Sequence, residues 1–393
     1  MILNVNAHVY PISKSAFLNL AECLVVLQLG RWNNLDDKTY MEVNGLESQD
    51  AIGKLKNLRY LGLRGLSRLT ELPKGIESLK KLVILDMRGC QNLVKVVSSV
   101  IKQLRQLTHL DLTECYMLEH IGQGITSLTE LQVFKGFVFA TGTQGKNKAC
   151  RIQDLKKLKK LQKLTVSITT DANVGKGEMA ELKYLTSLRK LTITWSEIPS
   201  ILEGDSEKVK KKREELVERW TSFQLPKDLM KLDIRCYPKG ELKLERHEKL
   251  EKLYLRGGDM QRFSANKSAS IKTLRLRYLK KFTMEWQDIC SELKNIEYVE
   301  IVLNNQDAMR GKDKSELVTK DAEDKEVKRI YKDVMKIPDF TLDGHGVWTK
   351  DQKEEDNKQK FLASNKDAME KNKGETCILR LCVAMQSLVL NIS

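Results

Sequence analysis

The sequence lacks the motifs on which most catalytic and metal-binding sites depend. Its 393 residues contain no G-x-x-x-x-G-K-[S/T] phosphate loop, no G-x-G-x-x-G opening a helix after a strand, no H-E-x-x-H and no G-x-S-x-G. The eight cysteines stand at irregular positions without a C-x-x-C pair, and only five histidines could complete a zinc site. We therefore expect no enzymatic activity, no cofactor and no metal ion.

Signals for secretion or membrane insertion are also missing. Residues 1–17 have neither a basic start nor a continuous apolar core, so they do not resemble a signal peptide. No apolar run reaches the ~18–20 residues that a membrane-spanning helix needs. We expect a reducing, cytoplasmic location, although N-x-S sequons at Asn266 and Asn391 are weak evidence for secretion.

One sign of charge is in excess. Lysine and arginine number 68 against 53 aspartates and glutamates, which gives a formal net charge of +15. Such an excess favours acidic partners, whether nucleic acid, an anionic membrane or an acidic protein surface. No nucleic-acid-binding motif accompanies the charge, so a lysine-rich, solvated surface explains it equally well and no nucleic acid is expected.

What the sequence does contain is a repeated phrase, L-x-x-L-x-L or a close variant. It begins at Leu58, Leu82 and Leu107, and the intervals of 24 and 25 residues are typical of a leucine-rich repeat. The L-x-L part alternates as a short strand, and stacked neighbours bury together the leucines that one repeat cannot bury alone. Eleven phrases begin at residues 24, 58, 82, 107, 131, 161, 188, 229, 250, 271 and 296.

The predicted fold is an α/β leucine-rich-repeat solenoid, or horseshoe, with a parallel β-sheet on its concave face. Residues 1–305 form this domain of about eleven irregular repeats, with a charged helical insertion near 205–221. A polar loop is expected at 141–146. Residues 306–393 are too charged to bury a core and form a mostly flexible extension, in which 344–348 could dock back onto the last repeats.

The residues between the leucines should face a partner protein. Tyrosine and arginine, which are enriched in interface cores, recur there, and the later part of the face is the more basic. Solubility alone could also explain polar residues at these positions. The predicted partner-binding residues are Tyr60, Arg64, Arg88, His109, Asp111, Lys190, Lys231, Arg235, Tyr254, Arg256, Arg275, Arg277 and Tyr298.

Two pairs of residues could suggest chemistry instead. His109 and Asp111 lie two apart on one predicted strand, but such a pair is far more often surface polarity than an acid–base dyad. Cys90 and Cys115 follow their phrases at the position that turns inward and satisfies backbone groups at the bend. We interpret both cysteines as structural.

Residues 55–93 and 107–138 resemble the leucine-rich-repeat region of plant coiled-coil NLR disease-resistance proteins. The Leu72-Pro73-x-x-Ile76 element is shared with Ras-group and SHOC-type repeats, whereas residues 111–116 and 131–137 are more specific. Residues 224–226 and 343–348 also match. The resemblance covers residues 1–305 and that short later element.

The resemblance implies a role in innate immunity. In such proteins the repeats recognise a pathogen effector or a modified host protein and restrain a nucleotide-binding switch. The sequence shows no coiled coil, nucleotide-binding domain or P-loop, so ATP or ADP binding is not carried over, and we expect a repeat-only relative or a partial gene product. The expected partner is an effector, a modified host protein, or an NLR or kinase. The alternatives are an intracellular Ras-group-type signalling scaffold and a basic nucleic-acid or membrane binder.

Overall fold

The chain folds as two compact units. The first comprises residues 1–240, 247–250 and 258–260, and the second comprises residues 241–246, 251–257 and 261–393. The computed structural model describes residues 2–3, 9–11, 22–30, 42–44, 50–141, 149–196, 207–244, 247–268, 270–279, 281–284, 286–302, 341–342 and 347–349.

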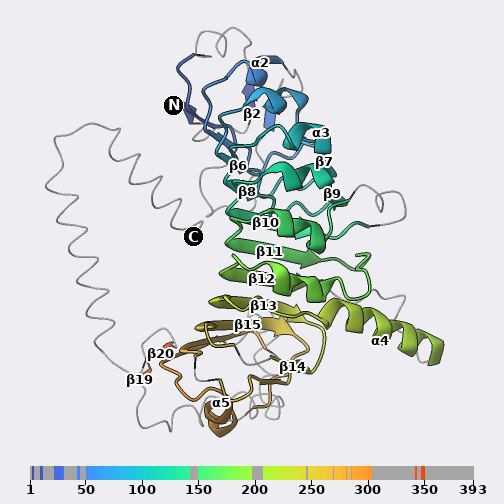
Figure 1. The fold of residues 1–393 in the computed structure, drawn as a ribbon, viewed down its shortest axis with the longest axis vertical. Coiled ribbons are helices and arrows are strands. Elements are labelled where there is room, and N and C mark those ends of the chain that lie inside the picture. The colour runs from blue at the N-terminus through green and yellow to red at the C-terminus, as the bar shows by residue number, and fades with distance from the viewer. Residues whose placement is uncertain are drawn as a thin grey trace, which may run out of the picture. The chain divides into compact units, whose positions relative to one another are not determined.

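A parallel sheet forms the backbone of the first unit, and its strands neighbour one another in chain order (Figure 1). Each strand from β3 onwards begins two residues after the first leucine of its phrase, as the period predicts. The strands are β1 (Ile2–Leu3), β3 (Val26–Gln28), β5 (Tyr60–Gly62), β6 (Ile84–Asp86), β8 (His109–Asp111), β10 (Val133–Val138), β11 (Lys163–Ile168), β12 (Lys190–Trp195) and β13 (Lys231–Tyr237).

The leucines of the phrases stack from one repeat to the next. Register pairs Leu61 with Leu85 and Leu85 with Leu110, and all three side chains are at most 1% exposed. Burying a leucine completely stabilises the folded state by roughly 1.5–3 kcal/mol. A one-residue slip would bring these side chains to the opposite face, so the leucines also fix the register.

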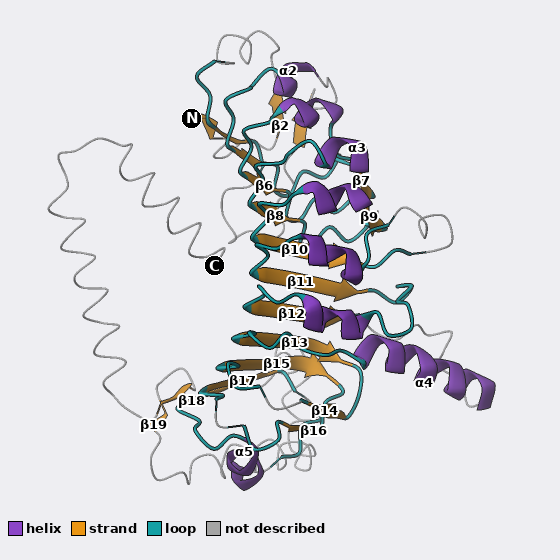
Figure 2. Cartoon of the chain, viewed as in Figure 1, coloured by secondary structure: helices purple, strands orange, loops and turns teal. Residues whose placement is uncertain are grey.

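Short helices return the chain from one strand to the next. Figure 2 shows them aligned along one side of the strands of the first unit. Pro73 immediately precedes η1, and Ile76 within it is fully buried, as the L-P-x-x-I element predicts. The helices of this kind are α2 (Asp50–Gly53), η1 (Lys74–Ser78), α3 (Ser98–Ile101), η2 (Gln123–Ser127), η3 (Ile152–Lys157) and η4 (Met179–Tyr184).

Two-stranded parallel pairs accompany these helices. Strand β2 (Val9–Pro11) pairs with β4 (Glu42–Asn44), and β7 (Lys95–Val96) pairs with β9 (His120–Ile121). Such pairing links consecutive repeats at a second place, away from the main sheet.

The long helix α4 (Glu207–Thr221) occupies the longest interval between phrases, where the sequence predicts a charged helix. Its C-terminal end is anchored by Trp220, which is fully buried and whose backbone carbonyl accepts a hydrogen bond of 3.2 Å from Nε1 of Trp195. The Trp195 ring also packs edge-on against Tyr237, with ring centroids 5.3 Å apart. An aromatic cluster therefore holds the insertion against the strands.

The second unit contains three parallel strands, β15 (Lys252–Gly258), β17 (Thr273–Arg277) and β18 (Tyr298–Val302). Strand β20 (Val347–Thr349) pairs antiparallel with β18, and β19 (Thr341–Leu342) pairs with β20. This pairing confirms, for residues 347–349, the docking of the G-H-G-V-W element onto the last repeat. The unit also contains β14 (Glu241–Lys243) paired with β16 (Arg262–Ser264), and α5 (Trp286–Glu292).

Two segments predicted from the sequence lie mostly outside the residues that the structure describes. Residues 142–146 of the predicted polar loop lie outside the described residues, and so does the predicted flexible extension apart from β19 and β20. Within the described part of the chain, no helix combines the length and the apolar character needed to cross a membrane.

Candidate functional site

The candidate site is the strand face, meaning the side chains that alternate with the buried leucines on β3 to β13 and on β15 to β18. Eight predicted partner-binding residues lie on it in the first unit and five in the second. Apart from Tyr60, all are at least partly exposed. The structure therefore places the predicted set on one face within each unit, but it gives the members different surroundings.

Tyr60 is part of the interior rather than the accessible face. Its side chain is 5% exposed, and its hydroxyl donates a hydrogen bond of 2.8 Å to Oε1 of Gln28. Burial raises the pKa of Tyr60 well above its ordinary value. Gly62 makes room for this contact, because a Cβ there would meet Oε1 of Gln28 at 1.8 Å. Gln28 therefore covers Tyr60, and a partner cannot reach the Tyr60 side chain on this strand.

Two carboxylates, Asp86 and Asp111, are paired in register on β6 and β8. Burial, then the charge of Asp111, raises the pKa of Asp86 to about 6. Each aspartate accepts a 3.0 Å hydrogen bond from the backbone N–H two residues later, in Arg88 and in Thr113. Both carboxylates therefore hold the turn that follows their strand, which is a structural role.

Lys135 brings a cation to this acidic pair. A register irregularity interrupts β10 between Phe134 and Phe137, and Gly136 within it has a φ of +84°. A Cβ on Gly136 would lie 2.4 Å from the carbonyl carbon of Leu112, so glycine is required. The bulge keeps Lys135 opposite Asp111, and its Nζ lies 3.2 Å from Oδ2 of Asp111.

The next three strands present a row of lysines, which we call the lysine ladder: Lys163, Lys190 and Lys231. Register pairs Lys163 with Lys190 and Lys190 with Lys231. The pKa of Lys163 is lowered to about 8. Burial is the largest cause, and the charges of Lys135, Lys190 and Lys231 follow. Like charges thus oppose one another along the face.

Arginines of the first unit have acidic neighbours instead. Nη2 of Arg235 donates a 2.7 Å hydrogen bond to Oδ2 of Asp233, whose side chain is mostly buried. Nε of Arg88 donates a 3.0 Å hydrogen bond to Oε2 of Glu114. Both contacts raise the pKa of the arginine concerned, which keeps its charge paired.

In the second unit, Glu300 organises an arginine–tyrosine cluster of Tyr254, Arg275, Arg277, Tyr298 and Glu300. The glutamate is 4% exposed and forms ion pairs with both arginines; Nε of Arg275 lies 3.0 Å from its Oε2, without the alignment of a hydrogen bond. The hydroxyl of Tyr298 donates a 3.2 Å hydrogen bond to the same carboxylate. The Arg275 guanidinium also lies over the ring of Tyr254, 4.6 Å from its centroid.

The groups weighed as possible chemistry have structural partners. His109 is in hydrogen-bond contact with Thr108, whereas Asp111 contacts Thr113 and Lys135. Burial, then Lys135 and Lys163, lowers the pKa of His109. Sγ of Cys90 donates to the carbonyl of Leu63 at 3.1 Å, and Sγ of Cys115 to that of Met87 at 3.3 Å. These contacts confirm the structural interpretation of both cysteines.

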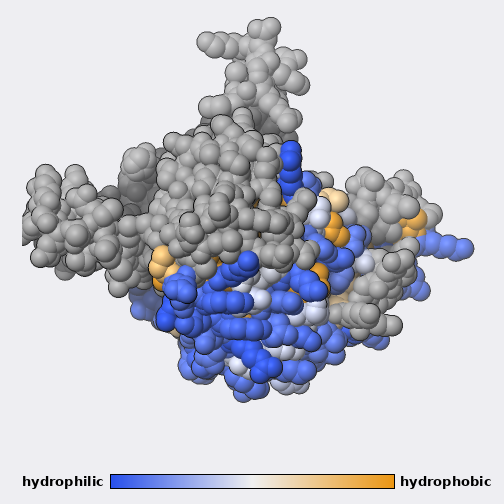
Figure 3. Space-filling model, turned by 90° about the horizontal axis from the view of Figure 1, so that it is seen from above, coloured by the Kyte–Doolittle hydropathy of each residue, from blue (hydrophilic) through white to orange (hydrophobic). Residues whose placement is uncertain are grey.

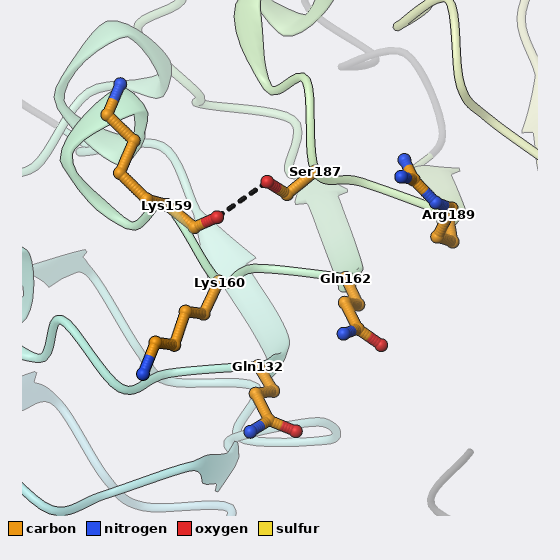
Figure 4. A pocket seen from close by; sticks show the side chains of 6 residues that line it. All are labelled: Gln132, Lys159, Lys160, Gln162, Ser187 and Arg189. Atoms are coloured by element: carbon orange, nitrogen blue, oxygen red, sulfur yellow. Dashed lines mark hydrogen bonds between the residues drawn. The ribbon is translucent and has the colours of Figure 1, made fainter.

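A cavity of about 380 Å³ lies where the chain enters β10, β11 and β12. Figure 4 shows that Lys159 and Lys160 extend in opposite directions instead of converging on one point. Lys160 is held by Glu130 at 2.6 Å, and Oγ of Ser187 donates to the carbonyl of Lys159 at 2.6 Å. The lining residues are Gln132, Lys159, Lys160, Gln162, Ser187 and Arg189.

Hydrophilic residues dominate the part of the surface visible in Figure 3, and hydrophobic residues lie among them singly or in small groups. Singly exposed hydrophobic side chains are normal on a protein surface. Within the described residues, no group of three or more His, Cys, Asp or Glu side chains could hold a metal ion. Polar and ionic contacts are therefore the chemistry that this surface offers.

Sequence reasoning missed the acidic partners and two cations. Glu114, Asp233 and Glu300 were not predicted to neutralise the arginines, and Lys135 and Lys163 were not among the predicted partner-binding residues. The lysine ladder had a visible signal, because the third position of consecutive phrases carries Lys163, Lys190 and Lys231. Parallel stacking aligns equal positions of successive repeats, so a residue type recurring there predicts a ladder.

Comparison with known proteins agrees with the fold. A family model described as a leucine-rich repeat region matches residues 9–176. Together with the parallel sheet and its stacked leucines, this match shows that the fold is a leucine-rich-repeat solenoid. A solved structure, the complex of TLR13 with ssRNA13, is 18% identical with a TM-score of 0.43, over 74% of this chain and 37% of that one.

Curated relatives carry disease-resistance names. The chain is 35% identical over 147 residues to Disease resistance RPP13-like protein 4 of Arabidopsis thaliana, which is 37% of this chain and 17% of the relative. It is 28% identical over 187 residues to a putative disease resistance protein of the same plant, 48% of this chain and 19% of the relative. The chain thus spans less than a fifth of each relative, and its repeats are similar to those of plant disease-resistance proteins.

Proposed function

We propose that the chain is a non-enzymatic protein-recognition module of the plant disease-resistance type, which binds its partner on the strand face. The observation that carries this proposal is the alternation, along β8, β11, β12 and β17, of buried apolar side chains with partly exposed polar residues. The leucines form the buried core that stabilises the fold, so the residues between them are available for recognition. Similarity to disease-resistance proteins supports the biological context.

The partner is a protein: a pathogen effector, a modified host protein, or an NLR or kinase. Such a module binds its partner without catalysing a reaction. Its polar side chains select the partner, and the rigid sheet limits the entropy lost on association. We propose a cytoplasmic location, in keeping with the similarity of the repeats to those of plant disease-resistance proteins.

A steric block tests the use of the strand face without changing charge. Thr192 and Thr194 are small, partly exposed residues at the centre of β12. The double variant Thr192→Tyr/Thr194→Tyr should lose the proteins that co-precipitate with the full chain expressed in leaf tissue. Thr186→Tyr, in the exposed loop before β12, is the matched control and should retain them.

The result must also separate this module from a Ras-group-type scaffold. A defence role requires that the strand-face variant also changes the response to infection, measured as pathogen growth in leaves expressing each variant. If the double tyrosine variant keeps every partner, or if partner loss leaves pathogen growth unchanged, the proposal in this form is wrong.

A further inference from the structure

The turns that lead into the strands are as regular as the strands themselves. In the three turns before β5, β6 and β8, the backbone N–H of a leucine donates to the carbonyl three residues earlier, at 2.9–3.0 Å. Neighbouring repeats lie ~4.8 Å apart, so the side chains of these turns extend from a rigid frame. The bonds run from Leu58 to Leu55, from Leu82 to Leu79 and from Leu107 to Leu104, and all six leucines are fully buried.

Basic side chains concentrate on these three turns, and we call them the turn patch. Every one of them is exposed to solvent. Within the described part of the chain, none of them forms an ion pair. The turn patch therefore offers positive charge that an acidic partner can use. Its members are Lys54, Lys56, Arg59, Lys80, Lys81, Lys102 and Arg105.

The equivalent turns further along the first unit show that the fold does not require this charge. The two residues between the leucines are Thr129 and Glu130 before β10, and Thr186 and Ser187 before β12. Both are lysines before β11, but the ammonium group of Lys160 forms an ion pair with Glu130 at 2.6 Å. Neutral or paired side chains thus meet the need for solubility in these turns, so solubility does not explain the turn patch.

Neutral amides orient two of the cations without cancelling their charge. Nζ of Lys80 donates a 2.8 Å hydrogen bond to Oε1 of Gln103 in the following repeat. Nζ of Lys81 donates a 2.7 Å hydrogen bond to Oδ1 of Asn57 in the preceding repeat. The two ammonium groups therefore extend in opposite directions, toward turns that lie two repeats, or roughly 10 Å, apart. Because they are already held, less side-chain entropy is lost when a ligand binds.

We propose that the turn patch binds a short, extended acidic segment of a partner protein. This inference goes beyond the proposed function, because it adds a second contact outside the strand face. Lys56 and Lys81 bind carboxylates at one end of the segment, and Lys80 and Arg105 bind carboxylates at the other. Residues three apart in an extended segment are separated by roughly 10 Å, which matches the separation of the two turns. Charge-assisted hydrogen bonds of this kind are about twice as strong as neutral ones.

The composition of the turn patch favours a polypeptide over a nucleic acid or a membrane. Proteins bind single-stranded nucleic acid by stacking its bases on aromatic rings, and surface helices bind membranes by burying apolar side chains among the lipids. In the three turns, residues 54–59, 78–83 and 102–108, the exposed residues are lysines, arginines and one glutamine. The amide of that glutamine, Gln106, can both donate to and accept from a peptide backbone. Ionic and amide contacts with an acidic polypeptide therefore fit this surface best.

A defined peptide tests the proposal with the full chain. The probe is fluorescein-labelled Gly-Glu-Glu-Gly-Glu-Glu-Gly, which carries two pairs of carboxylates three residues apart. Fluorescence anisotropy in about 0.15 M salt, where charges more than ~8 Å apart are largely screened, should show binding that the glutamine version of the peptide lacks. The variant Lys56→Gln/Lys80→Gln/Lys81→Gln/Arg105→Gln should weaken binding at least about tenfold, because it removes the four cations that contact the segment.

A matched quadruple variant controls for net charge. Lys176→Gln/Lys208→Gln/Lys211→Gln/Arg213→Gln removes the same charge from exposed positions outside the turn patch, three of them on α4. It should change the affinity less than about twofold. Thermal unfolding followed by circular dichroism verifies that each variant folds.

A single substitution of nearly the same shape tests the turn patch without removing a cation. Gln103→Glu gives Lys80 a carboxylate partner in place of the amide that it contacts. It should weaken binding about threefold, whereas Gln153→Glu, at an exposed position on η3, should leave binding unchanged. The strand-face variant Thr192→Tyr/Thr194→Tyr should bind the peptide as the wild type does, so the two proposals can fail separately.

Four outcomes would overturn the proposal. The wild type could fail to bind the acidic peptide, or the turn-patch variant could bind it as tightly as the wild type does. The control variant could lose as much affinity as the turn-patch variant, which would leave only an effect of net charge. A single-stranded oligonucleotide of equal charge, or vesicles of phosphatidylcholine and phosphatidylserine, could bind more tightly than the peptide and depend equally on the turn patch. That last result would assign the surface to a nucleic acid or a membrane.

Discussion

The lysine ladder and the arginine–tyrosine cluster are both basic, but their cations face different neighbours. In the cluster, Arg275 and Arg277 share the buried carboxylate of Glu300. In the ladder, Lys163 is surrounded by three other lysines, and its pKa falls to about 8. A buried carboxylate thus lies between the cations of the cluster, whereas lysine is paired in register with lysine in the ladder.

An ion pair within the protein reduces the charge that a basic side chain can offer to a partner. The arginines of the cluster are already bound within the protein, so a partner would have to displace Glu300 to use them fully. Pairing a buried carboxylate with arginine also orders those side chains, and such contacts support the fold more than they attract ligands. The sequence favoured the arginine-rich end for an acidic partner, whereas the structure pairs Arg275 and Arg277 with Glu300.

The largest expected effect comes from breaking the cluster. Glu300→Gln should lower the free energy of unfolding by about 2–3 kcal/mol, because it removes the shared counterion of two arginines. Urea unfolding measures this loss.

Glu297→Gln is the matched control for Glu300→Gln. Glu297 pairs with Lys272 at 3.1 Å, but both side chains are more than half exposed. Its removal should cost less than about 0.5 kcal/mol, as expected for a surface ion pair. Equal stability of the two variants would show that burial of Glu300 does not distinguish the cluster.

The repeats themselves were predictable from the sequence. Each strand of the main parallel sheet from β3 to β18 begins within a leucine phrase, because burial of the leucines depends only on their spacing within a repeat. The phrase beginning at Leu188, for example, places Leu191 and Ile193 in the core at no more than 1% exposure. Such local periodicity needs no knowledge of the neighbouring repeat.

Contacts between repeats were harder to predict. Tyr60 was expected on the face, but Gln28, 32 residues earlier, covers it. Glu300 neutralises Arg277 from a distance of 23 residues, and Trp220 reaches Trp195 across an insertion. These partners depend on register, insertion lengths and side-chain reach, which a pattern within one repeat does not specify.

A medium effect, with the opposite sign, is expected from the ladder. Lys163→Gln should raise the free energy of unfolding by about 1 kcal/mol at pH 7, because it removes a repelling charge. Urea unfolding against Lys157→Gln, an exposed lysine of η3, provides the comparison. A loss of stability specific to Lys163→Gln would contradict this expectation.

The pH dependence of folding stability tests the same effect of Lys163. The folded-state pKa of Lys163 is about 8, below the ordinary value of 10.5, so the unfolded chain holds more protons between these pH values. Folding stability should therefore rise between about pH 8 and pH 10.5 by a contribution that Lys163→Gln abolishes. The charged groups that act on Lys163 are Lys135 on β10, Lys190 on β12, Lys231 on β13 and Asp111 on β8.

The smallest effect is expected at Arg88, an arginine of the strand face whose ion pair is exposed. The side chains of Arg88 and Glu114 are 30% and 38% exposed, so water screens their attraction. Arg88→Gln should lower the free energy of unfolding by no more than about 0.5 kcal/mol, and Arg105→Gln, at an exposed loop position, should leave it unchanged.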